Sequence, residues 1–137
     1  MRSYEVLPHT ADTAISTRAE SLEAVIGNAA FAMFDLMYGL DEASPATSVQ
    51  LEVAVASPPD LLVSVLSELL YHSEVEDLAF AAFEVRIVGD HLLVDAAGVP
   101  VKTLEWYGPP IKAVTYHDLI CEEESDGVWH VQVIFDV

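Results

Sequence analysis

The sequence has very little cysteine, few basic residues and no long apolar runs. Its one cysteine, Cys121, excludes an intrachain disulfide, and its position among alternating apolar residues indicates a packed thiol rather than a nucleophile. No stretch approaches the roughly 18 uninterrupted apolar residues of a membrane-spanning helix. The first residues also lack the apolar segment of a secretory signal. We therefore expect a cytoplasmic protein.

The shortage of basic residues excludes several partners. Five Lys and Arg stand against 23 Asp and Glu, which gives a formal net charge of −18. Nucleic-acid affinity depends on Lys and Arg side chains displacing counterions, and an anionic membrane repels acidic proteins in the same way. The composition predicts no direct nucleic-acid binding and no membrane partner. Solubility accounts for most of the acidity, and cation binding or docking onto a basic partner are the functional alternatives.

The length and hydrophobicity indicate a folded domain. A chain of 137 residues with 53% hydrophobic content is long enough to bury a core. We find no low-complexity linker and no internal repeat. The expected organisation is one domain over residues 1–137.

Two helices are expected. Ser21 is a candidate N-cap for a helix that runs to about Tyr38 and ends at Gly39, and a second helix should span about Pro59 to Glu76. In both segments the apolar residues recur at helical spacing and form one core-facing stripe. The stripes consist of Leu22, Val25, Ile26, Ala29, Ala30, Met33, Phe34 and Met37 in the first helix, and Leu62, Val65, Leu66, Leu69 and Leu70 in the second.

The remaining segments alternate like strands. They cover residues 4–9, 13–19, 49–55, 83–88, 91–97, 111 to about 123, and 128–137, with hairpin turns at Gly89-Asp90 and Asp126-Gly127. Residues 102–110 read as irregular. Because strands and helices do not alternate regularly, the order argues against a doubly wound sheet. The fold class expected is α+β, with two helices packed on a largely antiparallel β-sheet.

Three places depart from simple patterning: the step His9 to Asp12, the run Lys112 to Asp118, and the last residues Phe135-Asp136-Val137. If Asp12 lies on a strand beside the last one, its carboxylate meets those of Asp136 and of the Val137 main chain. Such a cluster repels itself unless it takes up protons or a cation, and oxygen ligands suit Ca²⁺, Mg²⁺ or Mn²⁺. Spacing alone favours the simpler interpretation of three solvated acids.

The histidines add little by themselves. They show no zinc-ligand spacing, and His9 and His117 read as packing residues, although they are the only candidates for acid–base work. The sequence contains neither a glycine-rich phosphate loop nor a G-x-S-x-G elbow.

Taken together, the three places resemble the archease family. The resemblance covers nearly the whole chain, and its strength lies in the joint order of short motifs. These are Leu7-Pro8-His9-Thr10-Ala11-Asp12, Ala32-Met33-Phe34-Asp35-Leu36, Leu66-Ser67-Glu68-Leu69-Leu70-Tyr71, Lys112-Ala113-Val114-Thr115-Tyr116-His117 and Phe135-Asp136-Val137.

The resemblance implies an archease-like sandwich and a divalent-metal site formed by Asp12, Asp136 and the terminal carboxylate of Val137. Calcium is the ion most expected, with magnesium or manganese as alternatives. Lys112 matches the functional lysine of the family, and His9 and His117 belong to the same motifs. Ala14 departs from the pattern, since the family tends to have glycine there.

The resemblance also implies a non-catalytic activator of the RtcB-type RNA ligase, which promotes guanylylation of the ligase and repeated turnover in tRNA splicing and RNA repair. The alternative is a chaperone-like modulator of tRNA-modifying enzymes such as a tRNA methyltransferase. A metal-dependent hydrolase is a third and weaker hypothesis, because no set of base, nucleophile and oxyanion donor is evident. A homo-oligomer is compatible with the sequence.

Overall fold

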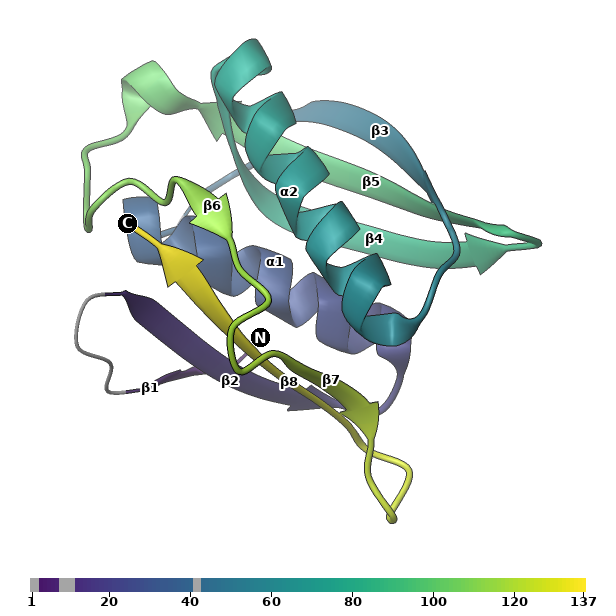
Figure 1. Cartoon of the computed structure of the whole chain (residues 1–137). Helices are drawn as coiled ribbons and strands as arrows, with labels where there is room; N and C mark the ends of the chain where they lie inside the picture. Colours follow the sequence, from purple (N-terminus) through teal and green to yellow (C-terminus); the bar gives the residue numbers. More distant parts are fainter. Residues whose placement is uncertain (1–2, 8–11, 41–42) are drawn as a thin grey trace.

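The structure is a computed structural model that describes residues 3–7, 12–40 and 43–137. In these segments two long helices are accompanied by antiparallel strands (Figure 1). The order along the chain is β1 (Glu5–Leu7), β2 (Thr13–Ala19), α1 (Leu22–Tyr38), β3 (Thr47–Ala54), α2 (Pro58–Glu76), β4 (Leu78–Val88), β5 (His91–Pro100), the 3-10 helix η1 (Val101–Thr103), β6 (Ala113–Val114), β7 (Ile120–Glu123) and β8 (Trp129–Asp136).

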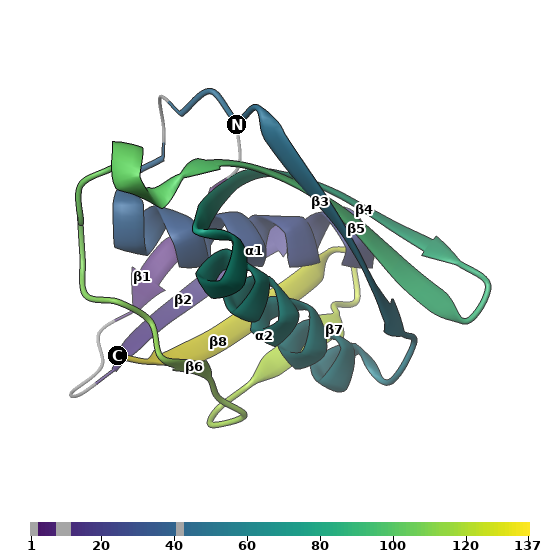
Figure 2. The same ribbon diagram turned by 90° about the horizontal axis from the view of Figure 1, so that it is seen from above.

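The strands form two sheets, with the helices between them. One sheet has the order β1-β2-β8, and the other edge of β8 pairs with β6 and β7. The second sheet has the order β3-β5-β4. Helix α1 contacts β4 of one sheet and β2 and β8 of the other, and α2 likewise contacts both sheets. Figure 2 shows the two sheets on opposite sides of the helix pair.

The expected fold class is thereby confirmed as α+β, with all strand pairs antiparallel in the described residues. The single sheet expected from the sequence is divided in two. An apolar stripe shows that a helix buries one face, but it does not reveal that the opposite flanks of the helix are covered by different sheets.

Helix α1 begins and ends where its sequence predicts. The Ser21 hydroxyl accepts a hydrogen bond from the Ala24 N–H at 3.0 Å, which satisfies one of the free donors of the first turn. Gly39 adopts φ +65° and its N–H donates to the Asp35 carbonyl at 2.8 Å. Glycine suits this left-handed position because it has no Cβ to clash.

Helix α2 spans Pro58–Glu76, one residue longer than expected. Proline is favourable at the first helical position, because its missing N–H would have no partner there. At the other end the C-cap is Asp77, a non-glycine residue with φ 55°. The buried Ser73 hydroxyl donates to the Leu78 carbonyl and ties this turn to the start of β4.

Two strand assignments need correction. The hairpin strands are longer than expected, because β4 starts at Leu78 and β5 continues to Pro100. The run from residue 111 to about 123 is two short strands, β6 and β7, rather than one. Between β6 and β7 the chain turns away from its pairing with β8, and Asp118 in this turn has φ 52°. The Tyr116 hydroxyl of the same turn donates to Asp60 of α2 at 3.0 Å.

The core lies where the helices meet both sheets. Phe34 of α1 is fully buried and contacts Phe80 edge-on, with ring centroids 5.5 Å apart, and Phe83 in a stacked arrangement at 6.2 Å. Aromatic pairs in these geometries stabilise beyond the area they bury. Phe34 therefore links α1 to β4 at the centre of the molecule.

Replacing Phe34 with alanine should lower the free energy of unfolding by about 3–5 kcal/mol, because the cavity cannot close between a helix and a sheet. Urea denaturation followed by circular dichroism measures this change. Val75→Ala, at a helix position that is 57% exposed, is the control and should change stability by less than about 0.5 kcal/mol. Equal effects of the two substitutions would contradict the assignment of Phe34 to the core.

Candidate functional site

The candidate site is the end of the first sheet, where β2 begins, β8 ends and β6 pairs with β8. Figure 1 shows the end of β8 beside β6 and the start of β2. The register pairs Thr13 with Phe135 on one side of β8 and Ala113 with Asp136 on the other. Three segments that are distant in the sequence therefore meet at one end of the sheet.

The register of β2 and β8 leads Asp12 and Asp136 to the same end of the sheet. Asp12 directly precedes the Thr13–Phe135 pair, and Asp136 directly follows it on the antiparallel strand. Residues directly opposite on antiparallel strands point to the same face, with Cβ atoms about 4.5–5.5 Å apart where the pairing is regular. Asp12 is half-buried and Asp136 is exposed. Val137 follows Asp136 and is half-buried, and the three expected residues thus lie at the same end of the sheet.

The donor chemistry of this edge suits a hard cation. The two aspartates and a main-chain carboxylate offer only oxygen atoms, which Ca²⁺, Mg²⁺ and Mn²⁺ prefer. Among the described residues, no three side chains of His, Cys, Asp or Glu form a possible metal cluster. The expected set contains only two such side chains and a main-chain group, so it remains a prediction.

Lys112 lies beside this edge and borders a groove against α2. Its N–H donates to the Asp136 carbonyl at 2.7 Å, which ties the start of β6 to the end of β8. Its side chain is exposed and, within the described residues, makes no ion pair. Together with Ser67, Tyr71 and Glu74 of α2 it lines an open groove of about 300 Å³.

Of the two expected histidines, the structure describes only His117. His9 lies outside the described residues. His117 is in the turn between β6 and β7, is largely exposed, and has its Nε2 3.5 Å from an Asp118 carboxylate oxygen. Ala14, where the family tends to have glycine, is in the regular part of β2.

The sequence analysis did not predict two features, one beside the strand end and one near the start of β8. The groove beside Lys112 is lined by the polar positions 67, 71 and 74 of α2, whose spacing of four and three places them on one helix face. The spacing of these polar positions could have predicted a polar face on α2, whereas the apolar stripe predicts only its buried face. The second is His130, whose Nε2 lies 2.9 Å from the Ser16 hydroxyl across β2 and β8.

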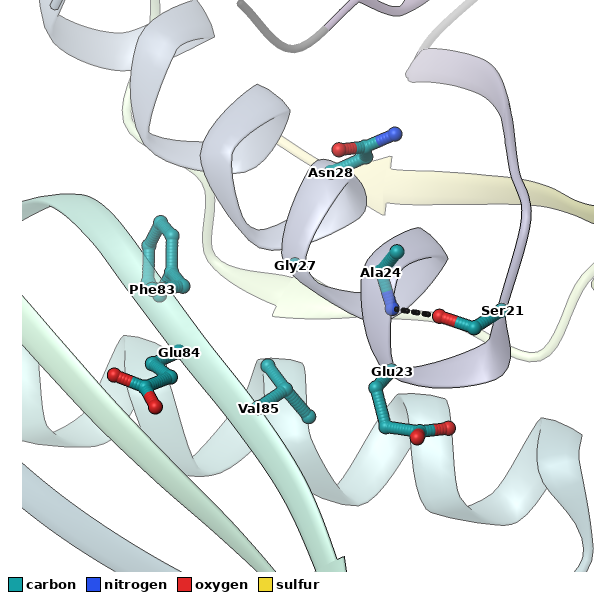
Figure 3. A pocket seen from close by; sticks show the side chains of 8 residues that line it. All are labelled: Ser21, Glu23, Ala24, Gly27, Asn28, Phe83, Glu84 and Val85. Atoms are coloured by element: carbon teal, nitrogen blue, oxygen red, sulfur yellow. Dashed lines mark hydrogen bonds between the residues drawn. The ribbon is translucent and has the colours of Figure 1, made fainter.

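Neither the Ser16–His130 pair nor a second groove, at the start of α1, offers the set of catalytic groups that a hydrolase needs. No carboxylate that the structure describes lies within 4 Å of a His130 nitrogen, so a Ser-His-acid triad is incomplete. Figure 3 shows the second groove, of about 420 Å³, between the start of α1 and β4. There the Ser21 hydroxyl caps the helix, and the charged groups are the carboxylates of Glu23 and Glu84.

Comparison with known proteins identifies the family. The fold and the strand-end site define a small α+β protein in which two antiparallel sheets enclose two helices. The family model described as the archease protein family matches residues 4–137, so the chain belongs to the archease family. It is 33% identical to protein archease of Pyrococcus furiosus over 142 residues, with both chains fully covered. It is 36% identical to protein archease of Methanosarcina mazei over 148 residues, covering 99% and 97% of the two chains.

Solved structures agree with this assignment. The solution structure of protein 1598 of Methanobacterium thermoautotrophicum superposes with a TM-score of 0.85 at 31% identity, with both chains fully covered. A crystal structure from Thermotoga maritima, described as an archease and possible chaperone, gives a TM-score of 0.68 at 21% identity over 96% and 94% of the two chains. At that identity the second similarity concerns the fold alone. No helix within the described residues is long and apolar enough to span a membrane.

Cys121 is a packing residue, as the sequence predicts. Its thiol is 4% exposed, and burial raises its pKa from the ordinary value of 9.0 to about 11. Because the folded pKa is the higher one, the buried neutral thiol contributes its full stability below about pH 9. That contribution is lost as the pH rises through about 11.

In native protein at pH 8, Cys121 should react with Ellman's reagent at least about a hundredfold more slowly than in protein unfolded by guanidinium, since the thiolate is the reactive form. Absorbance at 412 nm measures both rates. Comparable rates in the native and unfolded states would show that the thiol is accessible and reactive.

Proposed function

We propose that this chain is a protein activator of the RtcB-type tRNA-splicing and RNA-repair ligase. It would promote guanylylation of the ligase and allow repeated turnover, without itself being a catalyst. The family assignment supports this proposal, and the observation that carries it is the strand register at the end of β8. That register brings Asp12, Asp136 and Val137 to one edge with Lys112 beside them.

In this proposal the carboxylates of Asp12, Asp136 and Val137 hold a divalent cation, most readily Ca²⁺, with Mg²⁺ or Mn²⁺ as alternatives. When bound, the cation supplies positive charge that can orient a phosphate or carboxylate group of the partner. The role of the protein is to keep the ligand oxygens at a fixed strand end. The hydrogen bond from the Lys112 N–H to the Asp136 carbonyl helps to hold that end in place.

The proposed role for Lys112 is to contact an anionic group of the ligase or of its nucleotide. Its ammonium is exposed and, among the described residues, is not held by any acid of this chain. The groove it borders leaves space for a partner group. Since the chain carries 23 acidic residues, we propose that it reaches RNA chemistry through the ligase and not by binding RNA itself.

A chaperone-like role towards tRNA-modifying enzymes, such as a tRNA methyltransferase, is the second candidate. It is favoured by the description of the Thermotoga maritima relative as a possible chaperone. An aggregation assay separates the two proposals, because protection of an aggregating client should not depend on Asp136. Loss of protection in Asp136→Ala would tie both activities to the strand-end site.

Asp12→Ala and Asp136→Ala should each abolish the activation and the thermal stabilisation by cations. At a cation concentration tenfold above Kd, wild-type protein should gain about 1.4 kcal/mol of stability, because the ion binds only the folded chain. The measurements are the rate of ligase–GMP formation and the melting temperature with and without Ca²⁺, Mg²⁺ or Mn²⁺. Glu84→Ala removes an exposed acid from β4 and is the matched control. If wild-type protein does not accelerate ligase–GMP formation, the proposal is wrong.

Two further changes separate the parts of the site. Adding residues after Val137 moves the α-carboxylate away with little change in net charge, and it should weaken cation stabilisation and activation together. Lys112→Ala should reduce activation while leaving cation stabilisation intact, because its side chain is not a ligand. Retention of both properties in the extended protein would show that the Val137 carboxylate is not a ligand.

A further inference from the structure

Exposed aromatic side chains gather at one end of the molecule. Nine large hydrophobic residues are exposed in the part of the chain that the structure describes, and four of them lie at the end of α2 or in the connection that follows η1. These are Tyr71, Val75, Trp106 and Tyr107, with exposed fractions of 60%, 57%, 58% and 77%. Single exposed apolar residues are ordinary, but a concentration of Trp and Tyr is typical of binding surfaces.

The connection from η1 to β6 presents two of these rings in a fixed position. The Trp106 ring stacks on Tyr38 at the end of α1, with centroids 4.9 Å apart and planes 27° apart. The Tyr107 and Gly108 N–H groups both donate to the Met37 carbonyl, at 2.8 and 3.2 Å. Gly108 lies so close to the Leu36 carbonyl that a Cβ would collide with it. The segment is thus held against α1, and a surface that is already ordered loses little entropy on binding.

Tyr71 belongs to the neighbouring helix α2. Glu74 lies one turn after Tyr71 on the same face, and the two line the groove that Lys112 borders. Burial is the main cause that raises the pKa of the Tyr38 hydroxyl, and the negative charge of the nearby Glu74 carboxylate raises it further. Tyr38, Trp106 and Tyr107 form one surface at the end of α1, which we call the aromatic platform, and the Glu74 carboxylate of α2 lies near it. The groove that Glu74 shares with Tyr71 and Lys112 connects this region with the strand-end site.

Acidic residues surround the platform near helix C-termini, where negative charge is unfavourable. Both helices end here, as Figure 1 shows, and neither has a basic residue in its last turn. A helix C-terminus carries partial negative charge and is stabilised by cations. Acidic residues stand there instead, with Lys102 and Lys112 as the nearby basic residues. The acids are Glu74, Glu76, Asp77 and Glu105, and in the described structure none of them makes an ion pair.

We propose that the aromatic platform binds an arginine-bearing segment of a protein partner. A guanidinium group stacks on aromatic faces and also pairs with carboxylates, so it matches both the rings and the adjacent Glu74 and Glu105. A second copy of this chain, with its net charge of −18, fits the platform poorly, and so does an RNA strand. The platform goes beyond the proposed function, because it binds such a segment whether or not the partner is an RNA ligase.

The test uses a short arginine peptide with neutral ends, titrated into isotopically labelled protein at physiological salt and followed by NMR. The chain has two tryptophans, so the indole N–H signals separate a platform residue, Trp106, from a half-buried strand residue, Trp129. We expect the Trp106 indole and the amides of residues 71–77 to shift, and the Trp129 indole to stay. A lysine peptide of equal length should bind about fivefold more weakly, because it lacks the planar group that stacks.

Variants with matched controls complete the test. Trp106→Ala and Glu74→Gln should each weaken binding of the arginine peptide by about fivefold or more. Val88→Ala removes an equally exposed apolar side chain and Glu84→Gln an exposed acid on β4, and both should bind like wild type. Melting temperatures of all four variants show whether each is folded. Trp106 is exposed, and Trp106→Phe, which keeps a ring, should restore most of the affinity.

Several outcomes would overturn the proposal. Shifts spread over the whole acidic surface, or equal affinity for the arginine and lysine peptides, would mean attraction by net charge alone. Shifts produced by a uridine oligonucleotide, and not by the peptide, would assign the platform to nucleic acid. Sedimentation showing a dimer that Trp106→Ala dissociates would assign it to a second copy of the chain. If the arginine peptide caused no NMR shift, the platform would not be a binding site for an arginine-bearing segment.

Discussion

The pairing of β8 on both of its edges is the constraint on which the candidate site depends. β2 pairs with one edge along its whole length, and β6 and β7 share the other. A slip of one residue would turn the buried face of the strand outward, and Val131, Val133 and Phe135 are fully buried on that face. Core packing thereby determines which residues flank Asp136. The position of the candidate site is a consequence of the hydrophobic register of a strand whose last residue, Asp136, is polar.

The helices impose a second constraint, because they lie between two sheets with their C-terminal ends on the same side of the molecule (Figures 1 and 2). The connection after η1 crosses this side and is bound to the Met37 carbonyl. Its aromatic residues Trp106 and Tyr107 therefore cover the negative C-terminal end of α1. The groove of Tyr71, Glu74 and Lys112 lies beside the strand end, because the Lys112 N–H donates to the Asp136 carbonyl. The proposed cation-binding strand end and the proposed surface for a basic segment both agree with the acidic composition of the chain.

Local signals were sufficient for some elements and insufficient for others. Helix α1 begins after Ser21 and ends before Gly39 as expected, because its caps and its apolar stripe are encoded within one stretch of chain. The start of β4 at Leu78 was missed, since residues buried on both faces show no alternation. The division between β6 and β7 was also missed. The turn that separates them depends on a hydrogen bond from Tyr116 to Asp60 of a different element.

For the candidate site, the sequence by itself determined which side chains are present: two aspartates, a lysine and a large excess of acidic over basic residues. It also determined the family, through short motifs in a specific order. Only the tertiary structure decided that Asp12 and Asp136 lie at the same end of the pair β2 and β8, and that Trp106 stacks on Tyr38 near Glu74. The reason is physical. Composition and spacing specify charge and local periodicity, whereas proximity between distant segments arises from strand register and from how helices pack between sheets.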